Sequence, residues 1–415
     1  MFHSFAGRYW FLFALLVVGI LVILTWGNYQ FASSNPGGND FLVHWVGTRA
    51  LFIEGESPYS DQVAERIQTL AYGRLARPGE HELRVAYPLY SVIFFLPVAF
   101  IEDYTLARAI WMTFLEIGVV ILSLFTILLA RWRVQWWFIP IILIFSIFWY
   151  HGLRPIINGN AVLFVSLLLA GAFLAISSGR DELAGILLGL STIKPHLVVV
   201  LLGLIVLWMV SHRRWKTIIW IVITVGLLTA VFVLFIPDWP IQNLREILRY
   251  SSYNPPGTPA AIISTWLPAT GERIGWAFSA FWGILLLFEW VLTFGKHFRR
   301  FLWTACLTLA AGQWLGIQTD PGNFIIMYTA LGLIFAVWEE RWGRAGRILT
   351  ILSLLCLLII PWVLFINTIT FADQPQQDPI MFFPLPLLVI IGLYWIRWWL
   401  IRPPKLDIDE LRLVG

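Results

Sequence analysis

The sequence predicts an all-α integral membrane protein, a bundle of about twelve transmembrane helices, and three observations lead to this prediction. Of 415 residues, 59% are hydrophobic and only 13% are charged, about half the charged fraction of a soluble domain. The mean hydropathy is +0.78. Many of the 24 tryptophans stand beside charges, as in Arg131-Trp132-Arg133, where amphipathic rings suit the headgroup layer of a membrane.

The apolar runs long enough to cross the hydrocarbon lie at residues 9–31, 107–130, 134–150, 160–178, 183–210, 217–237, 273–294, 301–317, 324–338, 348–368 and 381–400. The run 183–210 has Lys194 and Pro195 at its middle. A charge there costs about 2.5–3.5 kcal/mol, and a proline breaks a helix. This run therefore predicts two short helices joined at Lys194, which gives twelve spans.

The segment 87–101 is apolar but short, and it contains Pro88 and Pro97. We expect it to be re-entrant or shallow, because a full crossing would place the basic group 131–133 outside the cell. If it does cross, the chain has thirteen spans.

The basic residues predict topology rather than a nucleic-acid partner. The formal net charge is +4, but the lysines and arginines occur in short groups between apolar runs and not on one face. Cytoplasmic loops collect such residues. The basic groups are 131–133, 180, 213–216, 296–300, 341–347 and 397–405, whereas loops 318–323 and 369–380 contain no lysine or arginine. Both termini are therefore expected in the cytoplasm, and the plasma membrane is the expected location.

The chain is expected to form one membrane domain, residues 1–415. Its parts are a first outer loop at 32–86, a core at 87–237, a second outer loop at 238–272, C-terminal helices at 273–400 and a cytoplasmic tail at 401–415. In the first outer loop, apolar residues recur at helical spacing in 40–53, and 59–72 can form a second amphipathic helix. Both helices are expected to lie flat on the outer membrane surface.

Polar residues that loop solubility does not explain collect on the predicted outer side. Asp40 and His44 are spaced i, i+4 and share one face of a helix. A carboxylate beside an imidazole can take a proton from a hydroxyl. The alternative is that Asp40, which follows Gly37-Gly38-Asn39, only caps the helix.

Cations lie on the same side. Lys194, at a break between two helices, can present a charge and free backbone groups to an anion at membrane depth; the alternative is a snorkelling lysine. Arg154 lies in the predicted outer loop 151–159, where few positive charges are expected, and it is either a phosphate ligand or a chance exception. His196 is either structural or an orienting group.

Glu116 and Glu289 stand inside apolar spans, and intramembrane carboxylates are candidates for function. They support an alternative function, a transporter or a lipid-linked sugar flippase, although no inverted repeat is visible. The opposing interpretation is structural pairing, in which Arg108 neutralises Glu116 from two helical turns away.

Three stretches resemble the family-87 glycosyltransferases of the GT-C class, with matching order and spacing over about residues 35–220. They are the first outer loop from Asp40 through Gly55-Glu-Ser-Pro-Tyr59; Tyr87-Pro88-Leu89 with the run to Leu96-Pro97; and Asn158-Gly159-Asn160, then Leu183–Leu190, Lys194-Pro195-His196 and Arg213-Arg214-Trp215. The late Ser-Pro…His stretch of the family is missing, and residues 318–323 contain no histidine. This departure bears on the sugar and the acceptor more than on the class.

The resemblance implies a GT-C bundle in which Asp40 matches the catalytic carboxylate and Lys194 a lysine of the donor-phosphate region. It implies a polyprenyl-phosphate sugar donor, with mannose or another hexose, and work at the outer face on a glycolipid or glycan acceptor. Inverting transfer needs a base and a stabilised leaving phosphate. We therefore expect Asp40 to be the base and no cofactor or metal to be required. The expected substrate-binding residues are Lys194, Arg154, His44, His196, Asn158 and Tyr59.

Overall fold

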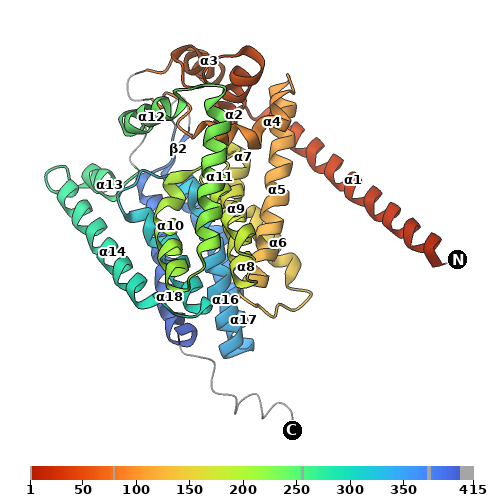
Figure 1. The fold of residues 1–415 in the computed structure, drawn as a ribbon, viewed down its shortest axis with the longest axis vertical. Coiled ribbons are helices and arrows are strands. Elements are labelled where there is room, and N and C mark those ends of the chain that lie inside the picture. The colour runs from red at the N-terminus through yellow and green to blue at the C-terminus, as the bar shows by residue number, and fades with distance from the viewer. Residues whose placement is uncertain (1, 78–79, 254–256, 372–374, 402–415) are drawn as a thin grey trace, which may run out of the picture.

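The computed structural model describes residues 2–77, 80–253, 257–371 and 375–401 as a helical bundle from which one long helix projects (Figure 1). The predicted tail 401–415 therefore lies outside the described residues except for its first position. In chain order, the first eleven helices are α1 (Phe2–Ser34), α2 (Asn39–Arg49), the π-helix η1 (Ala50–Glu54), α3 (Asp61–Tyr72), the 3-10 helix η2 (Leu89–Ser91), α4 (Val92–Ala99), α5 (Tyr104–Leu129), α6 (Ile139–Phe148), α7 (Tyr150–Asn158), α8 (Val162–Ser177) and α9 (Asp181–Ser191).

The remaining helices complete the bundle and include the predicted second outer loop. They are α10 (Pro195–Ser211), α11 (Trp215–Val233), α12 (Trp239–Tyr253), α13 (Pro259–Trp266), α14 (Gly271–Thr293), α15 (Phe298–Ala311), η3 (Gly312–Trp314), η4 (Pro321–Met327), α16 (Tyr328–Trp342), α17 (Arg344–Thr368), η5 (Pro379–Phe382) and α18 (Pro384–Ile401). Two short antiparallel strands, β1 (Thr370–Phe371) and β2 (Pro375–Gln376), pair Thr370 with Gln376.

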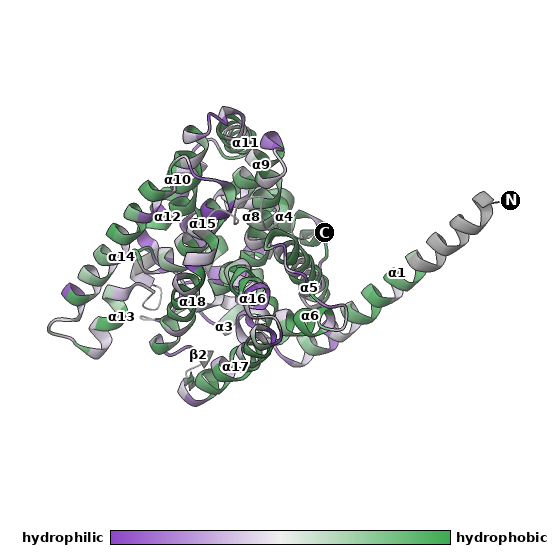
Figure 2. Ribbon diagram, turned by 90° about the horizontal axis from the view of Figure 1, so that it is seen from below, coloured by the Kyte–Doolittle hydropathy of each residue, from purple (hydrophilic) through white to green (hydrophobic). Residues whose placement is uncertain are grey.

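The helices confirm an all-α polytopic membrane protein. Among the described residues, seven helices are long and apolar enough to cross a bilayer, or up to eight if the bent pair α6 and α7 forms one span. Every predicted run contains a helix, but several are shorter than a bilayer requires. The number of crossings, twelve, stays a prediction. Figure 2 shows how hydrophobic helices such as α5, α6 and α17 are.

The predicted break in the run 183–210 is present. Helix α9 ends at Ser191 and α10 begins at Pro195, with Lys194 at the N-cap position. Proline suits the first position of a helix because that residue needs no backbone N–H donor. The sequence thus ends one helix and starts another around the lysine.

The segment 87–101 forms only a short helix over Leu89–Ala99, with Pro97 inside it. At 1.5 Å per residue, eleven residues extend about 16 Å, roughly half the thickness of the hydrocarbon. This length does not span a membrane, in agreement with the prediction that the segment does not cross.

Two expectations about connecting segments were wrong. The predicted loop 151–159 is mostly helix α7, which meets α6 at an angle of 53°. Helix α2 does not present one apolar face to a surface, because Phe41 through Thr48 are all buried under α3, α4 and α7, which pack against it. A helix that is apolar on one stripe can still be covered on every side when neighbouring helices pack against it.

The two predicted outer loops and the basic group 341–347 lie at opposite ends of the bundle (Figure 1). Helices α3 and α12 are at one end, and the junction of α16 and α17, with the basic group 341–347, is at the other. Such a separation is what the alternation of basic loops along the sequence requires.

Candidate functional site

Asp40 lies in the first turn of α2 but does not cap it. The N-cap is Gly38, whose φ of 79° is in the left-handed region, and no side chain caps the helix. The carboxylate of Asp40 instead accepts a hydrogen bond of 2.6 Å from the Nδ2 of Asn158, at the end of α7. The interpretation of Asp40 as a helix cap was therefore wrong, and its carboxylate is half-buried rather than solvated.

Close packing brings these two groups together. Gly159 follows Asn158 with a φ of 72°, and a Cβ at this position would lie 2.4 Å from the Cβ of Phe41. Only glycine accepts both the left-handed backbone and this approach. The indole N–H of Trp111 donates to the Gly159 carbonyl at 2.9 Å. The end of α7 therefore lies directly against the start of α2.

Arg108 of α5 holds the same two elements. Its guanidinium is buried and donates to the Asn35 carbonyl (2.8 Å) and the Ile157 carbonyl (3.0 Å). The Tyr104 hydroxyl, one turn earlier, donates to the Gly37 carbonyl at 2.7 Å. The interpretation in which Arg108 neutralises Glu116 was wrong, because the Arg108 guanidinium instead binds one carbonyl near each member of the Asp40–Asn158 pair.

Lys194 is 2% exposed, and two amide oxygens hold its ammonium. The Nζ donates to the Oδ1 of Asn160 at 2.6 Å and to the Oδ1 of Asn323 at 3.0 Å. It also lies 5.2 Å from the centre of the Tyr87 ring, within the range of a cation–π interaction. A snorkelling lysine would extend to the surface, so that interpretation was wrong.

A chain of hydrogen bonds orients Asn323 toward the lysine. Its Nδ2 donates to the Thr319 hydroxyl at 3.3 Å, and that hydroxyl donates to the Oε1 of Gln313 at 3.2 Å. The amide nitrogen of Asn323 is thereby engaged, which leaves its oxygen for Lys194. An ammonium has three N–H donors, so two amides do not exhaust it.

Four charges act on one another at this place. Burial raises the pKa of Asp40 above its ordinary value, the positive charges of Lys194 and Arg154 and the bond from Asn158 oppose this rise, and the negative charge of Asp320 adds to it. Yet none of these four charged residues takes part in an ion pair of the described chain. The site holds charges of both signs that are close but not directly paired.

Two of the predicted residues, His44 and the charged Arg154, contact aromatic rings at this place. His44 is buried between the rings of Tyr87 (4.5 Å) and Phe95 (4.1 Å). Burial and the charge of Lys194 lower the pKa of His44 to about 3, so the imidazole is neutral. Among the described residues it forms no hydrogen bond with Asp40. Arg154 extends over the rings of Tyr150 (5.8 Å) and Phe365 (5.7 Å).

Tyr59 and His196 lie around the charged group rather than in it. The Tyr59 hydroxyl donates to the Tyr87 carbonyl at 2.6 Å, so it holds the backbone of a residue that borders Lys194. His196 lines a small cavity together with Gln313 and Thr319, whose side chains belong to the hydrogen-bond chain of Asn323.

The intramembrane carboxylates have structural partners. Glu289 is buried and pairs with Arg397 (3.0 Å) and Arg300 (3.5 Å). Glu116 accepts a hydrogen bond of 3.0 Å from Asn28 of α1. These contacts favour pairing over a proton relay. Within the part of the chain that the structure describes, no group of three or more His, Cys, Asp or Glu side chains is arranged to hold a metal ion.

Several residues at the site were not assigned a role from the sequence. Asn160 belongs to the Asn158-Gly159-Asn160 group, and its proximity to a predicted outer polar cluster was a usable signal. Asp320 stands in the predicted outer loop 318–323, where its carboxylate accepts from the backbone N–H of Gly322 at 2.6 Å. Asn323 is 129 residues from Lys194, and no pattern in one sequence connects positions so far apart.

A sequence model of glycosyltransferase family 87 matches residues 86–252. The matched stretch contains Arg154, Asn158, Asn160 and Lys194. It contains neither Asp40, which precedes it, nor the asparagine at 323, which follows it. No curated protein and no solved structure gave a match to the chain.

Proposed function

We propose that this membrane-embedded member of glycosyltransferase family 87 transfers a hexose from a polyprenyl-phosphate donor to an acceptor hydroxyl. The transfer inverts the configuration at the anomeric carbon, and mannose is the first hexose to test. The observation that carries the proposal is that Asp40 and Lys194 are held by the amides of Asn158 and Asn160, which are only two residues apart. One is the proposed base and the other the proposed phosphate ligand.

Asp40 is suited to remove a proton from a hydroxyl. Its carboxylate is half-buried and fixed by one strong bond from Asn158. The raised pKa makes it a stronger base than a solvated aspartate, and a general base works best when its pKa approaches the ambient pH. Among the described residues, Asn158 binds only one of the two carboxylate oxygens, and we propose that the other accepts from the acceptor hydroxyl.

Lys194 and Arg154 are suited to the leaving group. As the bond between the anomeric carbon and the phosphate oxygen breaks, its electron pair goes to the phosphate, and fixed cations stabilise that charge. The acceptor oxygen bonds to the anomeric carbon from the opposite side, and Asp40 takes its proton. Two cations can balance a lipid monophosphate, so we propose that the reaction requires no divalent metal; activity should persist in excess EDTA.

The positions of the basic loops support a proposal about the side of the membrane. The proposed site lies toward the end of the bundle that carries α3 and α12, away from the basic group 341–347 (Figure 1). Because basic loops stay in the cytoplasm, the site is proposed to open to the outer face of the plasma membrane. A polyprenyl-linked donor and a glycolipid or glycan acceptor can both reach it there.

The test uses purified protein in liposomes with radiolabelled polyprenyl-phosphate-mannose or polyprenyl-phosphate-glucose and a mixture of glycolipid acceptors. We expect sugar transfer by the wild type, and loss of about 10²–10⁴-fold in Asp40→Asn. Glu65→Gln, an exposed position on α3, is the matched control and should keep full activity. Wild-type turnover in Asp40→Asn would remove Asp40 as the base, and inactivity of the wild type with every polyprenyl-phosphate sugar would remove the donor class.

A further inference from the structure

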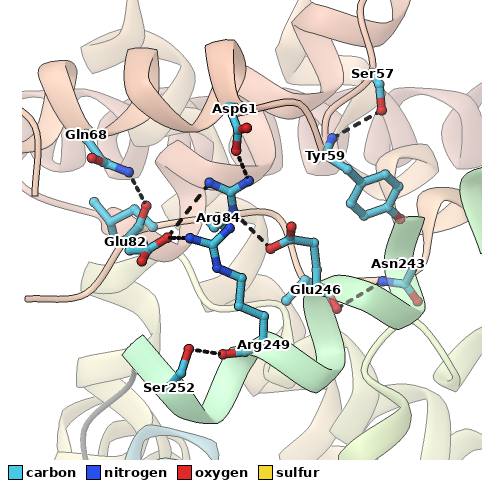
Figure 3. Close-up of polar contacts among 12 residues, drawn as sticks. Ser57, Tyr59, Asp61, Gln68, Glu82, Arg84, Asn243, Glu246, Arg249 and Ser252 are labelled. Carbon is cyan, nitrogen blue, oxygen red and sulfur yellow. Dashed lines mark hydrogen bonds and ion pairs between the residues drawn. The ribbon is translucent and has the colours of Figure 1, made fainter. Parts of the chain in front are cut away.

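Helix α12, in the second outer loop, has two faces of different character. One face bonds the first outer loop (Figure 3). Its polar contacts are Gln242 with Ser57 (2.6 Å), Asn243 with the Ala86 carbonyl (3.1 Å), Glu246 with Arg84 (3.0 Å) and Arg249 with Glu82 (2.9 Å). These contacts, with the buried Asn243 and Glu246, fix which side of the helix is turned toward the protein.

The opposite face is apolar and exposed. Ile241, Leu244, Ile247 and Leu248 are exposed by 56, 55, 44 and 72% of their surface. At 100° per residue these four positions fall on one side of the helix, facing away from Asn243 and Glu246. A contiguous apolar patch of this kind marks a contact with a protein or a membrane.

The position of the patch and its charges favour a membrane. Helix α12 begins six residues after α11, one of the candidate spans. Between the two helices, Leu234 is 84% and Phe235 53% exposed, so the apolar surface of the span continues toward α12. Arg245 is exposed beside the patch and forms no ion pair in the described chain. Basic residues beside an apolar stripe are typical of helices that lie among phospholipid headgroups.

We propose that α12 lies in the lipid–water interface on the side of the candidate site, with Ile241, Leu244, Ile247 and Leu248 in contact with acyl chains and Arg245 among the phosphates. This inference does not depend on the proposed reaction.

The contact has a structural consequence for the site. Asn243 binds the Ala86 carbonyl, and the next residue is Tyr87, whose ring lies beside Lys194 and whose carbonyl is held by Tyr59. The helix that rests on the lipid therefore holds the segment that borders the lysine. A lipid-borne phosphate at the membrane surface would lie at a similar depth.

The test places an environment-sensitive fluorophore on α12. Both native cysteines are replaced (Cys306→Ala and Cys356→Ala), and NBD is attached at Leu248→Cys or, in a second variant, at Leu244→Cys. Glu65→Cys, exposed on α3, is the matched control. Each protein is reconstituted in nanodiscs that hold one copy, with lipids that carry a nitroxide near the headgroup, and is also exposed to aqueous iodide.

We expect the labels at 248 and 244 to lose most of their fluorescence to the nitroxide lipid and little to iodide, and the label at 65 to show the reverse. Strong iodide quenching at 248 and 244 without nitroxide quenching would overturn the proposal. Labels that are shielded in liposomes with many copies, but open to iodide in single-copy nanodiscs, would instead assign the face to a second copy of the chain. Elution as a single monodisperse peak confirms that each variant is folded.

Discussion

Two groups of buried charges in this protein are balanced in different ways. At the candidate site, Lys194 is surrounded by amide oxygens and Asp40 by an amide N–H. In the two predicted outer loops, residues 32–86 and 238–272, the buried Arg84 forms ion pairs with three carboxylates, those of Asp61, Glu82 and Glu246 (Figure 3).

The difference reflects what each group of charges can do. An ion pair cancels both charges, and what remains is a fixed geometry, here the attachment of α12 to the first outer loop. A buried charge held only by amides keeps most of its field, which costs stability but lets it act on a substrate charge. We therefore expect the site charges to control activity and the loop charges to control stability.

Replacement of Lys194 tests the site half of this contrast and should have a larger effect than replacement of Arg84, Arg108 or Asn158. Lys194→Met keeps the length of the side chain and removes the charge, and we expect kcat to fall by about 10²–10³-fold. Thermal unfolding in detergent should shift little or upward, because an unpaired buried charge is gone. Lys216→Met, an exposed position in the first turn of α11, is the control and should retain full turnover.

Replacement of Arg84 tests the loop half. Arg84→Met leaves the buried Glu246 without its partner, and we expect the free energy of unfolding to fall by about 2–3 kcal/mol, less than for a fully buried pair because Asp61 and Glu82 are more exposed. Turnover per folded molecule should stay within a few-fold of the wild type. The double variant Arg84→Met with Glu246→Leu should recover part of the loss, and a larger loss in the double variant would contradict the pairing argument.

Arg108 is a positioning residue, and its effect should be intermediate. Arg108→Gln breaks the hydrogen bonds to the carbonyls of Asn35, near Asp40 in the sequence, and Ile157, next to Asn158. We expect kcat to fall about tenfold from misplacement of the base, with an unchanged KM for the donor, and Arg108→Lys to recover part of it. A rise in KM at constant kcat would place Arg108 in substrate binding instead.

The smallest effect should be a change in pH dependence. A carboxylate base is active when ionised, so activity is present above its pKa and is lost as the pH falls through it. The bond from Asn158 lowers the pKa of Asp40, which burial raises. Asn158→Ala should therefore move the acidic limb of the kcat profile to higher pH. Asn367→Ala, an exposed amide of α17, should leave the limb in place.

The sequence was sufficient for what depends on local pattern. Hydropathy predicted where the helices lie, although several are shorter than a bilayer requires, and a lysine followed by a proline predicted the break between α9 and α10. Counting spans predicted Asp40 and Lys194 on one side, and in the structure they are bound by Asn158 and Asn160, which are two residues apart. Their partners depended on contacts across the chain: Arg108 binds carbonyls 73 and 49 residues away, and nothing in its local sequence distinguishes this from pairing with Glu116. The burial of α2 likewise depends on what folds over it.

The ligand that Asn323 supplies to Lys194 has a consequence for biosynthesis. A nascent chain inserts α10 while the residues that will form η4 are still untranslated, 129 positions behind. Until the ribosome has passed Asn323, the ammonium of Lys194 has only one of its two amide ligands, Asn160, and the site is incomplete. The protein should therefore emerge from the translocon inert and acquire activity only once its last third has inserted.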